Sequence, residues 1–289
     1  MPRCAFLSTD ELEDFFVYDM MVAKPLNALG WQVEEVSWRD HGLEWNQYDL
    51  VVVRSTWDYQ DDHEAFLAVL ESMDSSSAQL ENPLPLMKWN ISKNYLRELA
   101  ANGIPIIPTL WIDNLEYPAV EAAFAHFKVD EIVIKPRISA NSDFTYRLNE
   151  TQLAAQFSEI KSQCLNKEMM VQPMVNSIVE KGEYSLFYFD GAFSHAILKT
   201  PKAQDFRVQE EHGGSLQLVE ASSALRALGQ DTLKALPYPA LYARVDIVEL
   251  PDTLAIIEVE LIEPSLYFNM DPSSAERFAQ AIARKYSAI

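Results

Sequence analysis

The sequence predicts a mixed α/β protein with an open parallel α/β domain, a small central domain and a C-terminal domain built on an antiparallel sheet. The chain opens with strand, helix, strand, the order in which parallel α/β domains begin. Near its end, residues 244–269 form two alternating segments joined by a turn at 251–253. The segments EYSLFYF and AFSHAIL flank Asp190-Gly191, which is a strong hairpin signal. We place the domains at residues 1–87, 88–172 and 173–289.

The first domain is expected to contain a strand at 4–8, an amphipathic helix around 15–29 closed by Gly30, strands at 32–37 and 50–53, and a connector at 73–85. Ligands of open parallel sheets bind beyond the carboxyl ends of the strands. The third strand ends in RSTWDY, so Arg54, Thr56 and Asp58 are candidates for binding a substrate's carboxylate or amine. Alternatively, Arg54 is a strand-end arginine paired to a nearby acid.

The elements expected next are a helix at 90–103 closed by Gly103, a strand at 107–111, a helix at 118–127, a strand at 131–135 and a helix at 151–163. Residues 168–171 then lead into the last domain. The Ile-Pro-Ile-Ile-Pro run after Gly103 forces extended chain, because a residue before proline avoids the helical region. These alternating elements predict a compact central domain.

Composition excludes several classes of protein. Of the 289 residues, 48% are hydrophobic and 23% are charged, which is typical of a soluble globular protein. A net charge of −20 argues against nucleic acid or an anionic membrane as partner. No apolar run reaches the roughly 20 residues that span a bilayer, the N-terminus is too acidic for a signal peptide, and two cysteines fit a reducing compartment. We expect a cytoplasmic monomer or homodimer.

The hairpin at 244–260 gathers carboxylates on one face. Because side chains alternate along a strand, that face is expected to carry Arg244, Asp246 and Val248 opposite Ile256, Glu258 and Glu260. With a three-residue loop, Asp246 lies opposite Glu258 at a Cβ separation of roughly 5 Å. One arginine cannot neutralise three acids, whereas Mg²⁺ binds one or two carboxylates together with nucleotide phosphates. The alternative is a solvated acidic face.

Lys135 is a second candidate, because a strand of buried character delivers it directly before Pro136. It can act as a phosphate clamp; the alternative is a surface charge at a strand end. The loop that follows, 139–142, is small and polar, and its backbone N–H groups could close over phosphates. The chain has only 8 glycines, and no glycine-rich phosphate-binding fingerprint occurs in it.

Two further cationic segments give weaker evidence for a phosphate-binding site. Lys93 begins the expected helix at 90–101, where a cation opposes the helix dipole unless an anion binds; a plain surface lysine is the alternative. Residues 199–214, with Lys199, Lys202, Asp205, Glu210 and Glu211, offer little apolar area and are expected to form a mobile lid. Arg207 could then meet a transferring phosphoryl group, and a solvated loop is the alternative.

Other chemistries lack their motifs. The sequence has no G-x-S-x-G segment and no histidine or cysteine spacing suited to zinc. The five histidines are scattered and are expected to be surface or structural residues: His41, His63, His126, His195 and His212.

Taken in order, these residues resemble the ATP-grasp superfamily over about residues 88–270. Lys93 and Lys135 look like its two ATP lysines, residues 170–175 look like its adenine hinge, and Pro264 matches a proline after the metal strands. Arg207 and the pair Gly213-Gly214 look like the basic residue and oxyanion-binding glycines of the glutathione synthetase and ribosomal-protein glutamate ligase branch. VVVRSTWDY and KPRISANSDFT are similar to the subgroup that closes the ring of D-cycloserine.

The resemblance implies roles for particular residues. The nucleotide would be bound by Lys93, Lys135, Ser139, Gln172, Met174, Val175, Glu180 and Glu183. Asp246, Glu258 and Glu260 would hold the metal, although Glu260 stands where many members have asparagine, and Ser265 stands where glycine is common. The catalytic set would be Arg207, Lys199, Arg244 and Gly214.

The implied activity is that of a carboxylate–amine ligase dependent on ATP and Mg²⁺, or Mn²⁺ in its place. The carboxylate of a small amino-acid-like substrate would attack the γ-phosphate, and an amine would displace phosphate from the acyl phosphate to form an amide, cyclic if both groups lie on one molecule. Such chemistry needs positioning and charge neutralisation. A kinase on the same scaffold and a non-catalytic nucleotide-binding protein are the alternatives.

Overall fold

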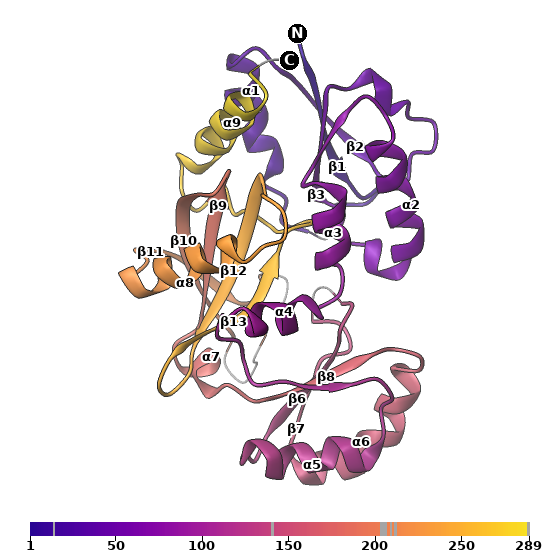
Figure 1. The fold of residues 1–289 in the computed structure, drawn as a ribbon, viewed down its shortest axis with the longest axis vertical. Helices are drawn as coiled ribbons and strands as arrows, with labels where there is room; N and C mark the ends of the chain where they lie inside the picture. Colours follow the sequence, from indigo (N-terminus) through magenta and orange to yellow (C-terminus); the bar gives the residue numbers. More distant parts are fainter. Residues whose placement is uncertain (14, 140–141, 203–206, 209, 211–212, 288–289) are drawn as a thin grey trace.

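The first sheet is parallel, with strand order β2-β1-β3-β4 (Figure 1). The computed structural model describes the chain except for residues 14, 140–141, 203–206, 209, 211–212 and 288–289. The elements up to residue 90 are β1 (Arg3–Ser8), the 3₁₀ turn η1 (Asp19–Val22), α1 (Ala23–Ala28), β2 (Gln32–Ser37), η2 (Trp45–Gln47), β3 (Leu50–Ser55), η3 (Tyr59–Asp61), α2 (His63–Asp74), β4 (Gln79–Glu81) and α3 (Leu84–Asn90). The expected order of strands is confirmed.

Two expectations for this part of the chain were wrong. The helix expected at 15–29 is confined to η1 and α1, because Pro25 is tolerated only in the first turn of an α-helix. The connector at 73–85 contains β4, a strand of three residues that pairs with β3 and buries Leu80. So short a strand has too few residues to show an alternating pattern.

The second sheet is antiparallel, with order β5-β8-β6-β7, and Figure 1 shows α5 and α6 together on one side of it. Its elements are β5 (Leu110–Ile112), α5 (Tyr117–Phe127), β6 (Ile132–Pro136), β7 (Tyr146–Leu148), α6 (Glu150–Gln163) and β8 (Met169–Pro173). A capping box of Asn149 and Gln152 starts α6. The two helices bury a core of their own against the sheet.

The helix expected at 90–103 is divided between α3 and α4 (Tyr95–Ala101). The break falls at 91–94, where the Asn94 N–H donates to the Ser92 hydroxyl (3.4 Å); such local bonds compete with the helical pattern. Inside the break, the backbone N–H of Lys93 donates to the Arg137 carbonyl oxygen (2.7 Å). This bond brings Lys93 to the end of β6, the strand that carries Lys135.

The third sheet is antiparallel, with order β11-β10-β9-β12-β13. The remaining elements are α7 (Asn176–Glu180), β9 (Glu183–Phe189), β10 (Ala192–Thr200), β11 (Ser215–Val219), α8 (Ser223–Lys234), β12 (Tyr242–Glu249), β13 (Leu254–Glu260) and α9 (Ser274–Lys285). Asp190 (φ 49°) and Gly191 (φ 75°) form the tight turn that joins β9 to β10, as their sequence predicts.

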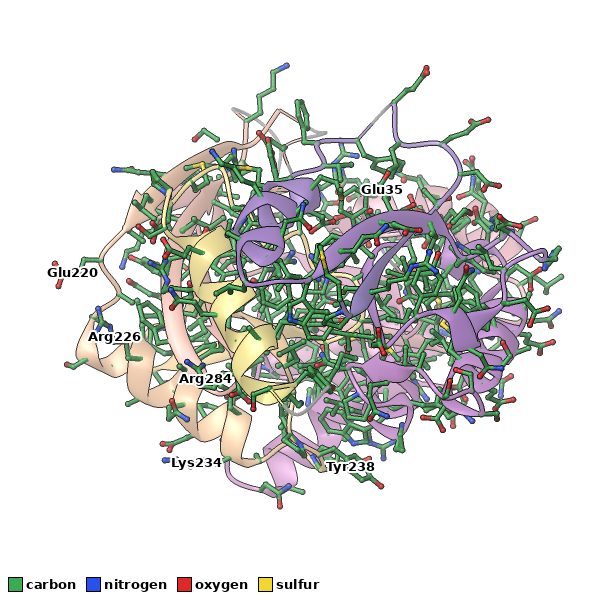
Figure 2. The ribbon with its side chains drawn as sticks, turned by 90° about the horizontal axis from the view of Figure 1, so that it is seen from above. Glu35, Glu220, Arg226, Lys234, Tyr238 and Arg284 are labelled. Carbon is green, nitrogen blue, oxygen red and sulfur yellow. The ribbon has the colours of Figure 1, made fainter. Side chains whose placement is uncertain are left out.

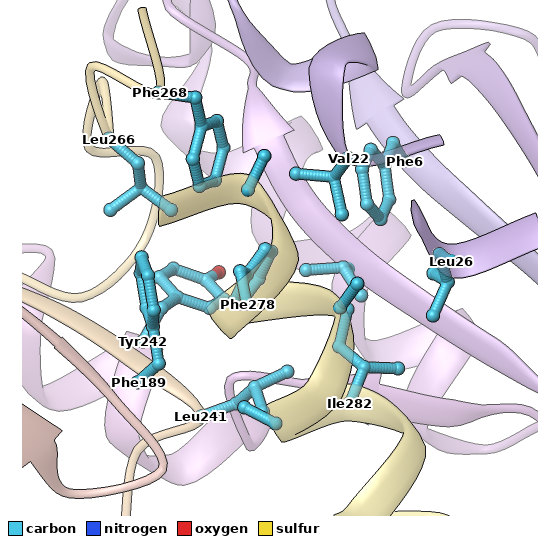
Figure 3. Packing of buried hydrophobic residues seen from close by; sticks show 14 of the residues in the cluster. Phe6, Val22, Leu26, Phe189, Leu241, Tyr242, Leu266, Phe268, Phe278 and Ile282 are labelled. Carbon is cyan, nitrogen blue, oxygen red and sulfur yellow. The ribbon is translucent and has the colours of Figure 1, made fainter. Parts of the chain in front are cut away.

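Helix α9 joins the first and third sheets through one hydrophobic core (Figure 3). Phe278 and Ile282 of α9 pack with Phe6 and Leu26 of the first domain and with Phe189 of β9. The packing places α9 beside α1 (Figure 1). It also holds the carboxyl end of β3 against the third sheet, where the site described below is formed.

His195 is buried in this region and is a structural residue, as expected from the sequence. Its ring stacks on Phe187 with centroids 4.2 Å apart, Nδ1 accepts a bond from Ser194 (2.9 Å), and Nε2 donates to the Leu266 carbonyl oxygen (3.2 Å). Burial lowers its pKa from 6.5 to about 4, with Arg277 adding to the effect and Asp271 opposing it.

This lowered pKa predicts an acid-sensitive contribution to stability. The unfolded chain binds a proton at His195 more tightly than the folded one, so stability is full above pH 6.5 and falls as the pH approaches about 4. Over that interval the wild type should lose about 3 kcal/mol more than His195→Gln. Urea unfolding at several pH values measures the difference; exposed His41→Gln is the control, and parallel curves for wild type and His195→Gln would contradict the prediction.

Candidate active site

The register of β12 and β13 pairs Asp246 with Glu258 and Arg244 with Glu260, as the alternation predicts. Asp246 is buried, and its Oδ1 accepts a hydrogen bond from Ser185 of β9 (2.5 Å). The carboxylates of the hairpin therefore share one face of the third sheet.

The turn between the two strands differs from the expected three-residue loop. Glu249 pairs with Leu254, which leaves the four residues 250–253 in the turn. A β-bulge between Asp246 and Ile247 restores the register and leaves Ile257 as the extra residue of β13. Ile256 consequently packs in the core, against expectation, and Ile257 lines the cavity beside Glu258.

These carboxylates line a cavity between the three sheets. Walls come from the end of β3, from the break before α4, from β6 and β8, and from β9, β10, β12 and β13. Among the described residues that line it, the positive side chains are Lys93, Lys135, Lys199, Arg207 and Arg244. The negative ones are Glu183, Asp246, Glu258, Glu260 and Glu263. Five charged side chains of each sign meet here, so lysines and a second arginine join Arg244 beside the acids.

Ion pairs connect cations and acids that lie far apart in the sequence. Lys93 Nζ lies 3.0 Å from Glu258 Oε1 and donates to the Ser139 carbonyl oxygen (2.8 Å). Lys199 Nζ lies 2.6 Å from Glu183 Oε1 and 3.5 Å from Asp246 Oδ2. Each contact links different strands or segments, so the charged groups hold the walls of the cavity together.

Arg244 pairs with the remaining acids of the hairpin. Its Nη2 lies 2.9 Å from Asp246 Oδ2 and also bonds Glu260. In the described part of the chain, no group of three or more histidine, cysteine, aspartate or glutamate side chains is arranged to hold a metal ion. The acids of the hairpin are instead bonded to cations.

Burial sets the protonation equilibria of the cavity. It lowers the pKa of Lys135 to about 8, with Lys93 adding to the effect and Glu258 opposing it. Burial raises the pKa of Glu260 to about 7, with Glu258 contributing and Arg244 opposing, and raises that of Glu263 to about 8. Both acids titrate near neutral pH, so the cavity has a net charge of zero or above in a chain of net charge −20. A cavity of this charge suits a polyanionic ligand.

Neighbouring cations lower the pKa of the other two acids of the hairpin. Burial alone would raise the pKa of Asp246, but Arg244 and Lys199 outweigh it and lower that pKa. Lys93 and Lys135 likewise lower the pKa of Glu258 despite its burial. Asp246 and Glu258 are therefore carboxylates at neutral pH.

The end of β8 forms a less polar wall. Gln172, Met174 and Val175 line the cavity there with Ile107. The backbone N–H of Met174 donates to the Glu131 carbonyl oxygen (3.0 Å), so this N–H is already bonded within the protein. This wall suits a flat, weakly polar group.

Glu180, predicted to bind the nucleotide, is exposed at the end of α7 and is not among the residues that line the cavity. The Ser177 hydroxyl ties α7 to the Glu249 carbonyl oxygen (2.5 Å) at the outer end of β12, and the last turn of the helix faces solvent. Glu183, three residues later, does line the cavity.

The three predicted substrate-binding residues point elsewhere. Arg54 is fully buried; it pairs with Asp19 (2.9 Å) and donates to the Pro264 carbonyl oxygen (2.6 Å), so the alternative reading of a strand-end arginine paired to an acid holds. Thr56 is fully buried, and Asp58 bonds Trp38 (2.7 Å) and Arg39 (2.6 Å). None of the three lines the cavity.

The cavity is lined from the first domain by residues that the sequence reasoning missed. Trp57 and Tyr59 alternate with Thr56 and Asp58 and face the opposite way, into the cavity, together with Phe15. The argument that selected Thr56 and Asp58, their place directly after a strand of a parallel sheet, could also have pointed to Trp57 and Tyr59. Beyond Glu260 the missed residues are Glu263 and Tyr267.

The loops at the mouth of the cavity are described in part. Ser139 and Ser142 line it, while Ala140 and Asn141 lie outside the described residues. Arg207 also lines the cavity.

The segment expected to form a lid, 199–214, overlaps the end of β10. Lys199 belongs to β10, where the ion pairs to Glu183 and Asp246 hold it. Gly214 directly precedes β11, whereas Asp205 and Glu211 are outside the described residues. The lid itself stays a prediction.

Comparison with known proteins identifies the family. Residues 4–82 match the family model of the N-terminal domain of the D-cycloserine synthetase DcsG. The cycloserine biosynthesis protein DcsG of Streptomyces lavendulae is 32% identical over 300 residues, covering 96% of this chain and 97% of that protein. The chain belongs to the DcsG family of ATP-grasp ligases. The crystal structure of D-cycloserine synthetase DcsG superposes with a TM-score of 0.86 at 30% identity, over 98% of this chain and 99% of that one.

The fold extends to more distant ATP-grasp ligases. The ligase PsnB, in a complex with a minimal precursor, Mg and ADP, has a TM-score of 0.66 at 14% identity, over 98% of this chain and 97% of that one. As a member of the DcsG family, the chain is an ATP-dependent ligase that forms carbon–nitrogen bonds. The predicted fold, an open parallel α/β domain followed by a small central domain and a C-terminal domain built on an antiparallel sheet, is confirmed.

Proposed function

We propose that ATP binds in this cavity and activates the carboxylate of a small amino-acid-like substrate, which an amine then attacks to form an amide. The convergence of five cations on one buried cavity of a strongly acidic protein carries the proposal. Lys93 and Lys135 would hold the phosphates, and Gln172, Met174 and Val175 would contact the adenine. Ser139 would add polar contacts to the phosphates, and Glu183 would lie toward the ribose.

The donor set suits Mg²⁺, with Mn²⁺ as a substitute, because hard cations prefer carboxylate oxygens completed by phosphates. Asp246, Glu258 and Glu260 would hold the ion, which when bound would neutralise charge on the phosphates. Lys93 now pairs with Glu258, and an incoming phosphate is an alternative partner for it. Nucleotide and metal should therefore bind better together than separately.

The remaining charged groups would act on the reacting atoms. Arg207 would stabilise charge that develops on the γ-phosphoryl and acyl oxygens, with the backbone of Gly214 nearby. Lys199 and Arg244 would hold Asp246 in place from two sides, at 3.5 and 2.9 Å. Positioning of this kind supplies most of the catalysis of phosphoryl transfer.

The name of the DcsG relative indicates the substrate class. D-cycloserine is a cyclic amide that carries a primary amine, so we propose that the carboxylate and the amine of this reaction lie on one small molecule. A kinase acting on a hydroxyl would need the same lysines and metal ligands, and its product would differ. A non-catalytic nucleotide-binding protein is disfavoured by the retention of five buried or half-buried cations.

The partners, the cell compartment and the oligomeric state of the protein are proposals as well. A net charge of −20 disfavours nucleic acid and anionic membranes as partners, and no helix in the described ranges could span a bilayer. Cys4 and Cys164 are both free and buried, which fits a reducing cytoplasm. A monomer or homodimer would suffice for the cavity, since one chain supplies every wall.

The test is ADP release from ATP and Mg²⁺ across a panel of amino acids and amino-acid derivatives, with mass spectrometry of the products. A ligase that closes a ring yields a product one water lighter than its substrate. A product heavier by one phosphoryl group would favour the kinase.

Lys135 predicts how nucleotide affinity depends on pH. Phosphates favour the charged amine, whose pKa in the free protein is about 8, so ADP·Mg²⁺ affinity should fall as the pH rises above that value. The affinity for ADP·Mg²⁺ should fall by up to about tenfold per pH unit. Calorimetric titrations of ADP·Mg²⁺ between pH 8 and about 9 measure this change. Lys135→Arg stays charged and should show a flat profile; the same decline in both proteins would contradict the prediction.

A further inference from the structure

One acid of the cavity differs from the others. Glu183, Asp246, Glu258 and Glu260 each form an ion pair with a lysine or arginine. Within the part of the chain that the structure describes, Glu263 is the cavity acid that has no ion pair. Burial of an acid that has no cation beside it favours the neutral form, and a ligand that supplies a positive charge favours the carboxylate.

The surroundings of Glu263 hold it in one position. Tyr59 interacts with the Glu263 carboxyl group and lowers the pKa of that group, and Trp57 Nε1 donates to the Glu263 carbonyl oxygen (2.8 Å). Tyr59 is itself fixed by stacking on Phe66, with ring centroids 4.9 Å apart. The next residue, Pro264, accepts a bond from buried Arg54 (2.6 Å). Glu263 is thus tied to the first domain on both sides.

Glu263 lies beside the wall that the first domain contributes, whereas Lys93 and Lys135 come from other walls. Aromatic rings surround this end of the cavity: Phe15, Trp57, Tyr59 and Tyr267. The faces of such rings attract cations. Burial together with Glu260 raises the pKa of Glu263 to about 8, as expected for a carboxylate whose charge is not compensated.

We propose that Glu263 binds the ammonium group of the amino-acid substrate, with Tyr59 orienting the carboxylate. An ammonium group would supply the positive charge that no described lysine or arginine provides to Glu263, and the aromatic wall would exclude water around it. The assignment rests on the proposed function and names the residue that would select a substrate with an amine. It requires a primary amine on the substrate close to the wall that the first domain contributes.

The experiment compares two probes, D-cycloserine and the same ring lacking the amino group, titrated into protein saturated with ADP and Mg²⁺. The wild type should bind the amine-bearing ring more tightly by about tenfold or more, the range expected of a hydrogen bond to a charged group. Glu263→Gln should remove this preference while leaving ADP·Mg²⁺ affinity and melting temperature unchanged. Tyr59→Phe should reduce it, because the carboxylate loses its orienting bond.

Glu220→Gln is the matched control. Glu220 is an exposed acid on the outer surface (Figure 2), and its substitution should leave the preference intact. The inference is overturned if Glu263→Gln retains the preference, or if the wild type binds ADP·Mg²⁺ and shows no preference between the rings. A wild type that fails to bind ADP·Mg²⁺ would contradict the proposed function, and the inference with it.

Discussion

Glu258→Gln should lower kcat on the order of a thousandfold while the protein stays folded. The substitution keeps the side-chain volume and removes one charge from the proposed metal site, where Glu258 also pairs with Lys93 at 3.0 Å. A thousandfold loss corresponds to about 4 kcal/mol of transition-state stabilisation, within the range expected for a metal that neutralises phosphoryl charge. Steady-state ADP release at several Mg²⁺ concentrations measures the loss.

Glu249→Gln is the control for this experiment. Glu249 lies on the same strand pair, but its ion pair with Lys181 (2.5 Å) is at the surface. Exposed pairs contribute at most about 1 kcal/mol to stability, and this one is remote from the cavity. Turnover of Glu258→Gln close to wild type, with unchanged Mg²⁺ dependence, would refute the assignment of Glu258 to the metal.

Arg207→Ala should lower kcat about a hundredfold, equivalent to about 3 kcal/mol, with little change in KM for ATP. Arg207 lines the cavity and would contact oxygens whose charge grows in the transition state. Lys135→Met should instead raise KM for ATP strongly, because phosphates keep their charge throughout the reaction. Initial rates over a range of ATP concentrations separate the two effects.

Arg226→Ala provides the control for Arg207. Arg226 lies on the outer surface (Figure 2), where its guanidinium stacks over Phe193 at 4.6 Å, and its loss should leave both constants unchanged. If Arg207→Ala kept full kcat and weakened ATP binding alone, Arg207 would have no part in the chemical step.

Local sequence patterns predicted the elements whose determinants are local. The strand at 32–37 has the expected bounds, and α5 and α6 each begin one residue earlier than expected, because alternation, helical periodicity and caps act over a few residues. The facing positions of Asp246 and Glu258 were predictable for the same reason. The bulge at Ile257 was not, since one extra residue leaves no mark in a short apolar run.

The charge pairing of the site could not be predicted, because its partners are distant in sequence. Lys93 meets Glu258 only after α4 packs on the third sheet, where Tyr95 joins the core of β12 and β13. Packing of the first domain on the third sheet makes Arg54 a buried structural residue and turns Trp57 and Tyr59 into the cavity. Residue type alone identified most of the charged residues of the site, and tertiary packing determined which of them line the same cavity.

The central claim is that a substrate carboxylate is activated by phosphorylation before an amine attacks it. The most direct measurement uses a substrate whose carboxylate oxygens carry heavy oxygen, chosen from the amino acids that release ADP. Attack on the γ-phosphate and displacement by the amine must transfer one labelled oxygen from each carboxylate to the released phosphate. Mass spectrometry of that phosphate should find the label in every turnover. Unlabelled phosphate from turnovers that form the amide would contradict the account, because the lost carboxylate oxygen would then have left by another route.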